Sequence, residues 1–199
     1  MAIVMKRIGY GQVEPNHLSG IVTGQIYAQL PAMTATTTGT GDNAVTTITP
    51  IAQLEQGQFA KYDYANGAVN FTGDGEFMLV YNEEKLYDER QQRHKDFVYR
   101  ATDFTDGKLF PRLIRTYVGD IMTTNTLATA NTSNVAEVNS SLSVSVGNYL
   151  TVDSNGFLVV AQSGNSAATT MPASGMVWKV VKEYTMPDGQ PGIKIQRVQ

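Results

Sequence analysis

The chain has 199 residues with a net charge of -3 and a pI near 5.3, a balance that excludes free nucleic acid as the main partner because phosphate binding needs clustered Lys and Arg in net excess. It contains no Cys, which excludes disulfides, thiolate nucleophiles and Cys-ligated zinc. Thr (22 residues) and Gly (18) are abundant, favouring strands and tight turns, so we expect an all-β protein, a hairpin-rich barrel or sandwich.

The N-terminal segment lacks the pattern of a signal peptide. Its charges, Lys6 and Arg7, follow a short apolar run instead of preceding it. No stretch is long enough for a transmembrane helix. We therefore expect synthesis in the cytoplasm and no membrane partner.

Residues 1–54 are predicted to form an extended N-terminal arm, and residues 55–199 a β-rich domain. Asp42 is the only charged residue between Pro15 and Leu54. The Thr- and Gly-rich run 34–43 has little capacity to form a core and is typical of a loop or arm. Two interpretations stay open, a flexible linker and an arm that becomes ordered against a neighbouring subunit.

Two segments of the second region resemble each other. Residues 56–63 (QGQFAKYD) and 146–153 (VGNYLTVD) place Gly, an amide, an aromatic residue and Asp at the same offsets, and Asn-Gly follows each of them. Asn-Gly between apolar runs is a strong hairpin signal because both residues tolerate a positive φ. The pattern predicts two related strand–turn–strand units or, alternatively, two hairpins that converged on the same turn chemistry.

Further strands follow from apolar runs and alternation. Residues 77–81 predict a short buried strand, and residues 176–184 and 193–198 predict a hairpin with one buried face. Residues 83–95 are predicted as either one short helix, capped by Asn82, or a charged loop, because the segment lacks an apolar stripe.

Candidate catalytic, cofactor-binding and metal-binding residues are absent from the sequence patterns. His17 and His94 have no metal-site spacing, and the loop holding Asp74 and Glu76 has too few oxygen ligands for Ca²⁺. Trp178 could stack on a sugar ring, but its place inside a strand pattern favours a core position. We therefore predict a protein that is not an enzyme and needs no cofactor.

The segment 83–120 is the densest in charge. It holds sixteen of the 33 charged residues, eight acidic and eight basic. Two interpretations are open, a solvated surface and a subunit-contact patch in which balanced charges set the register and aromatic side chains act as anchors. The candidate contact residues are Tyr87, Arg90, Arg93, Phe97, Arg100, Phe104, Arg112 and Arg115. The nearly uncharged stretch 122–145 is predicted as a loop or as a segment laid along a neighbour.

The two similar units, together with the block 84–90 (EKLYDER) followed by residues 95–97 (KDF), resemble capsid decoration (cement) proteins of tailed bacteriophages. The resemblance covers residues 55–199. It implies a homo-oligomer without catalytic residues that binds the outer surface of the virion capsid and bridges major capsid subunits. The length and the charged insert depart from the smallest members, which keeps a head–tail connector or tail component as an alternative. A carbohydrate-binding module is the alternative from another class.

Overall fold

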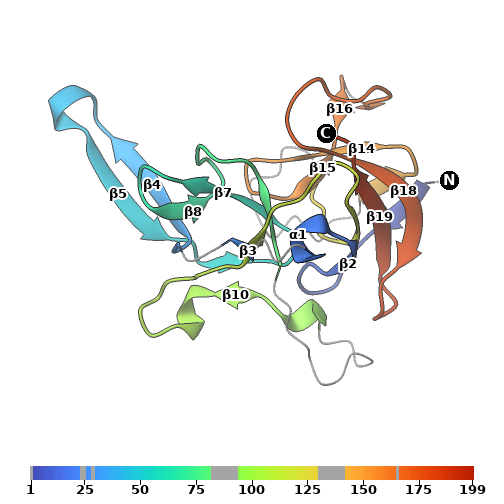
Figure 1. The fold of residues 1–199 in the computed structure, drawn as a ribbon, viewed down its shortest axis with the longest axis horizontal. Coiled ribbons are helices and arrows are strands. Elements are labelled where there is room, and N and C mark those ends of the chain that lie inside the picture. The colour runs from blue at the N-terminus through green and yellow to red at the C-terminus, as the bar shows by residue number, and fades with distance from the viewer. Residues whose placement is uncertain (1, 23–25, 28–29, 82–93, 130–141, 165) are drawn as a thin grey trace.

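A computed structural model describes residues 2–22, 26–27, 30–81, 94–129, 142–164 and 166–199. The regular structure of the described residues is mainly antiparallel β-structure, arranged in two main sheets and four two-stranded pairs (Figure 1). This confirms the all-β prediction. The expected barrel is not formed, because both main sheets are open and have free edge strands.

The larger sheet has six strands, mostly from the C-terminal half. Its order is β15 (Leu158–Val160), β14 (Tyr149–Val152), β18 (Val177–Thr185), β19 (Pro191–Arg197), β12 (Ile121–Thr124) and β2 (Val13–His17). The predicted C-terminal hairpin is confirmed as β18–β19, which shifts register at a bulge between Val180 and Lys182.

The smaller sheet has five strands from the N-terminal half. Its order is β3 (Ile26–Tyr27), β11 (Leu113–Ile114), β9 (Met78–Val80), β7 (Phe59–Asp63) and β8 (Ala68–Asn70). The predicted hairpin after residue 56 is confirmed as β7–β8, and the apolar run near residue 79 is β9, which is fully buried.

The two sheets have the same topology. The order β8-β7-β9-β11-β3 matches β15-β14-β18-β19-β12 strand for strand, and the strands follow one another along the chain in the same sequence. Equivalent parallel bridges precede the two hairpins, Ala32 to Val69 and Leu127 to Leu158. The similarity between the two predicted units thus extends to the topology of whole sheets, which we call repeat 1 (26–114) and repeat 2 (121–197).

The sequence similarity reflects a shared hydrogen-bonded turn. The amide of Gly57 donates to the carbonyl of Val80 at 3.0 Å, and the amide of Gly147 donates to that of Val180 at 2.8 Å. Both glycines adopt a positive φ, +87° and +93°, which only Gly adopts without strain. The recurring Gly therefore forms the turn that precedes the first hairpin of each repeat.

One core joins the repeats. Phe59 and Leu79 from repeat 1 pack into the same cluster as Leu150, Trp178 and Ile195 from repeat 2. The rings of Phe59 and Trp178 lie 6.0 Å apart. Because side chains alternate across a strand, the neighbours Ala60, Met78 and Val80 point instead into a second cluster within repeat 1.

Parts of the predicted N-terminal arm belong to the body of the protein. Strand β1 (Ala2–Met5) pairs with β13 (Leu142–Ser145), and β2 is an edge strand of the larger sheet. Arg7 and Glu55 form a buried ion pair with an N–O distance of 2.6 Å. The apolar run of β1 explains this difference, since Met5 is part of the shared core and Ile3 packs against it, while Val4 between them is exposed.

The Thr-rich run, predicted as a loop or an arm, has regular structure. It forms a hairpin of β4 (Met33–Thr38) and β5 (Val45–Pro50), joined through the 3-10 turn η1 (Gly41–Asn43). Thr is β-branched and favours extended backbone. Six residues before the Gly-rich tip therefore pair with six residues after it.

The remaining elements are short. Pairs form between β6 (Gln53–Leu54) and β10 (Tyr99–Arg100), and between β16 (Gln162–Ser163) and β17 (Ser166–Ala167); the helical turns are α1 (Ser19–Val22), η2 (His94–Asp96) and η3 (Ala101–Asp103). Most of the predicted helix over 83–95 lies outside the described residues. In the stretch 122–145, predicted as a loop or surface segment, both described ends are strands, and Met122 is fully buried.

Candidate subunit-contact surface

The β4–β5 hairpin projects from the body of the molecule (Figure 1). Every residue of β5 and four of the six residues of β4 are exposed. The beginning of β4 contacts β8, and Met33 and Ala35 are partly buried. The rest of the hairpin is a two-stranded ribbon with no packed face, which is at best marginally stable in water. This hairpin therefore has a large unpartnered surface, and its edges carry unpaired backbone groups.

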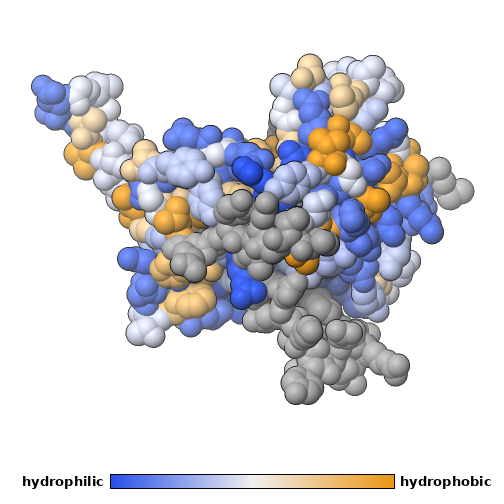
Figure 2. Space-filling view, in the orientation of Figure 1, coloured by the Kyte–Doolittle hydropathy of each residue, from blue (hydrophilic) through white to orange (hydrophobic). Residues whose placement is uncertain are grey.

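The surface of the hairpin is uncharged except at its tip. Asp42 in η1 is its single charged residue. Val45 and Ile48 are 61% and 44% exposed, and the hydroxyls of Thr37 and Thr46 share a hydrogen bond at 2.9 Å. Figure 2 shows the hairpin standing clear of the body, with apolar surface beside pale Thr surface. Such a composition suits contact with another protein better than contact with water alone.

The base of the hairpin is firmly attached to repeat 1. The amide of Ala32 donates to the carbonyl of Leu109 at 2.7 Å, and the amide of Ile51 donates to the carbonyl of Ala32 at 3.0 Å. Ala32 is completely buried. The projection therefore starts from a fixed point, which limits the directions in which the tip can reach.

The charged segment lies beside this base. Its strand β10 pairs with β6, placing Arg100 opposite Gln53, and the amide of Ala101 donates to the carbonyl of Ala52 at 2.9 Å. In chain order it is an insertion between β9 and β11, where repeat 2 has only the turn between β18 and β19. Both elaborations, hairpin and insert, therefore lie on the same repeat.

Two of the candidate contact residues, Phe97 and Arg100, each contact an aromatic side chain that was not among the candidates. Phe97 stacks edge-on against Tyr99 with ring centroids 5.1 Å apart. Arg100 is exposed, lies 5.5 Å from the ring centroid of Tyr10 and donates to its hydroxyl at 3.2 Å. These are two separate pairs, because Tyr99 and Arg100 are successive residues of β10 and Tyr99 packs against the core of repeat 1.

Other candidates lie apart or outside the described residues. Phe104 is 43% exposed, Arg112 is exposed, and Arg115 is ion-paired with Glu76. Tyr87, Arg90 and Arg93 are outside the described residues. The eight-residue contact patch as a whole stays a prediction.

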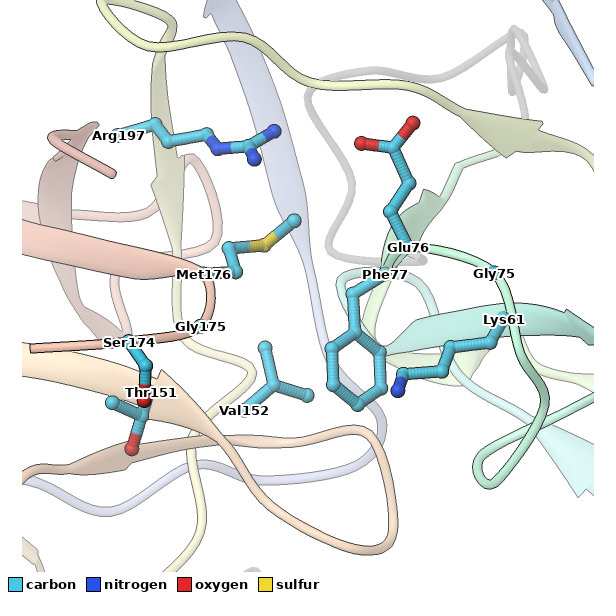
Figure 3. A pocket seen from close by; sticks show the side chains of 10 residues that line it. All are labelled: Lys61, Gly75, Glu76, Phe77, Thr151, Val152, Ser174, Gly175, Met176 and Arg197. Carbon is cyan, nitrogen blue, oxygen red and sulfur yellow. The ribbon is translucent and has the colours of Figure 1, made fainter.

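A pocket of about 420 Å³ lies between the two repeats (Figure 3). Equivalent positions of the repeats line it, Lys61 with Thr151 and Gly75 with Gly175. Phe77, Val152 and Met176 supply apolar walls, and Lys61, Glu76 and Arg197 supply charge. In Figure 3 Arg197 and Glu76 lie at one end and Lys61 at the other.

The charges of the pocket are unequal. Glu76 is engaged by Arg115. The ammonium of Lys61 lies 4.5 Å from the ring centroid of Phe77, and no ion pair of Lys61 is found in the described part of the chain. Burial lowers the pKa of Arg197, which remains protonated at neutral pH. The pocket therefore has an excess of positive charge.

The described residues give little support to other chemistry. Trp178 is fully buried, so its ring cannot stack on a sugar, and the predicted core position is confirmed. His17 is exposed at the end of β2. Among the described residues no three His, Cys, Asp or Glu side chains gather as metal ligands, and no helix there is long and apolar enough to span a bilayer.

Sequence reasoning missed the pocket and the form of the hairpin. The pocket is lined by residues as far apart in the chain as Lys61 and Arg197. The only related signal in the sequence is the similarity of the two repeats, which places Lys61 and Thr151 at equivalent positions. The hairpin had a readable signal, two runs of Thr, Val and Ile around the Gly-rich residues 39–43.

No protein-family model, no curated protein and no solved structure matches this chain.

Proposed function

We propose that this chain is a non-enzymatic virion structural protein, a capsid decoration protein that binds the outer surface of a phage head and bridges major capsid subunits. The observation that carries the proposal is the β4–β5 hairpin, exposed on both faces and uncharged except at its tip. The sequence resemblance to decoration proteins supplies the particle and the partner.

The mechanism follows from the shape of the hairpin. Its free edges offer backbone donors and acceptors to a strand of a neighbouring subunit, and its Val and Ile side chains offer apolar contact. Because the base is fixed in repeat 1, contact made at the tip is transmitted to the whole body. A subunit held at its body and at its hairpin bridges two neighbours in the lattice.

The charged insert contributes the second contact. It lies beside the hairpin base and carries Arg100, Phe104 and Arg112 at the surface. Interleaved charges set orientation and reject wrong partners more than they add affinity. The hairpin thus supplies most of the contact area, and the insert fixes the orientation of the bound subunit.

The test uses particles of the phage whose genome encodes the chain. Purified chain is added to heads lacking it, and bound protein is measured by cosedimentation. We expect saturable binding that is lost when residues 36–47 are replaced by Asn-Gly, which closes the strands at the Ala35–Ile48 pair. The variant Lys182→Glu, at an exposed residue of β18, serves as the control and should bind normally. Absence of the chain from purified virions, together with no binding to heads, would refute the proposal.

A further inference from the structure

We propose that the pocket between the repeats receives the tip of the β4–β5 hairpin from a second copy of this chain, with the Asp42 carboxylate of one copy accepting hydrogen bonds from the Lys61 ammonium of the other. The inference rests on the proposed role as an assembling subunit. It adds the identity of the contact between copies.

Charge complementarity supports this pairing. The pocket holds an excess of positive charge, since Glu76 is already paired with Arg115 while Lys61 contacts only a ring in the described part of the chain. Asp42 is the single charged residue of the hairpin and lies at its tip. An ion pair enclosed by apolar walls is stronger than one in open water.

The pocket and the hairpin tip also match in size and in apolar character. The pocket volume of about 420 Å³ falls within the roughly 300–1,000 Å³ of pockets that enclose small groups. Phe77, Val152 and Met176 line it, and Val45, which is 61% exposed, follows the tip. The tip and the first residue of β5 thus offer one carboxylate and one apolar side chain to a pocket lined by Lys61, Arg197 and apolar walls.

The contact has to be between copies. Figure 1 shows the hairpin pointing away from the strands that line the pocket. A hairpin of one copy inserted into the pocket of the next is a heterologous contact, which forms a ring if the rotation closes and an open chain if it does not. Either arrangement suits a protein that covers a lattice.

The experiment measures self-association of the purified full chain by sedimentation velocity at concentrations up to about 1 mM, where weak contacts are detectable. We expect concentration-dependent association that falls by about tenfold or more in Asp42→Lys and in Lys61→Glu. Lys182→Glu, with the same charge change at a distant exposed site, should associate like the unmodified chain.

Charge exchange makes the test specific. A mixture of the Asp42→Lys and Lys61→Glu variants, and a chain carrying both substitutions, should regain association, because each tip then meets a pocket of opposite charge. A chain that stays monomeric throughout would overturn the inference. So would normal association of Lys61→Glu, or no recovery in the mixture. Binding to phage heads is measured separately, so loss of this contact and loss of the proposed function are distinguishable.

Discussion

Asp63 and Asp153 occupy equivalent positions in the two repeats but have opposite environments. Asp63 accepts hydrogen bonds from the side chains of Asn66 and Asn70, both at 2.9 Å. Asp153 accepts from the amides of Asn155 and Phe157 through Oδ1, while its buried Oδ2 has no partner among the described residues. The equivalent Asp is therefore held mainly by side-chain amides in repeat 1 and by backbone amides in repeat 2.

Substitution by Asn should separate the two roles. Asp63→Asn places an NH₂ group against other NH₂ groups, and we expect a loss of about 1–3 kcal/mol in the free energy of unfolding. Asp153→Asn keeps the Oδ1 acceptor and removes a buried charge, so we expect a change within about 1 kcal/mol. Urea unfolding followed by the fluorescence of Trp178, the single Trp, measures both; equal losses would contradict the assignment.

The same pair predicts how acid acts on stability. Hydrogen bonding by Asn66 lowers the pKa of Asp63, so its stabilisation is present above the unfolded pKa near 4 and is lost as pH falls through the lower folded value. Burial raises the pKa of Asp153, so its cost in the folded state is relieved as pH falls through the raised value. Unfolding of Asp63→Asn should therefore depend less steeply on pH below about 4 than unfolding of the unmodified chain. A steeper dependence would contradict this account.

At the scale of single elements, the hairpin should be dispensable for folding. Residues 36–47 are exposed on both strands, so replacing them with Asn-Gly should change the free energy of unfolding by about 1 kcal/mol or less. Urea unfolding with Trp178 as the probe measures this, because Trp178 lies in the shared core. A large loss would show that the hairpin supports the fold instead of serving an external contact.

Some of these elements were predictable from the sequence and others were not. The hairpins around Asn66-Gly67 and Asn155-Gly156 were predictable, because a local turn signal and apolar runs specify both strands. The hairpin of residues 33–50 was not predicted, because Thr-rich strands without a buried face resemble loops in composition. The pairing of β1 with β13 joins residues about 140 positions apart, and no local pattern specifies such a contact.

The whole molecule is built from two main sheets with the same topology. Two sheets of equal topology share one core, and the pocket forms where their equivalent positions meet. The similarity of two eight-residue segments predicted related units, but not that whole sheets repeat, because the other paired strands differ in sequence. The added elements of repeat 1, the hairpin and the charged insert, mark the side of the molecule that we assign to assembly.

The β4–β5 hairpin, in the function that we propose, contacts other subunits of a phage head, and electron cryo-microscopy of the purified virion can test this contact. We expect density for the two repeats on the outer capsid surface, with residues 33–50 enclosed between this chain and a neighbouring subunit. A map in which the chain is present but the hairpin points into solvent, or in which the chain is absent from the head, would contradict it.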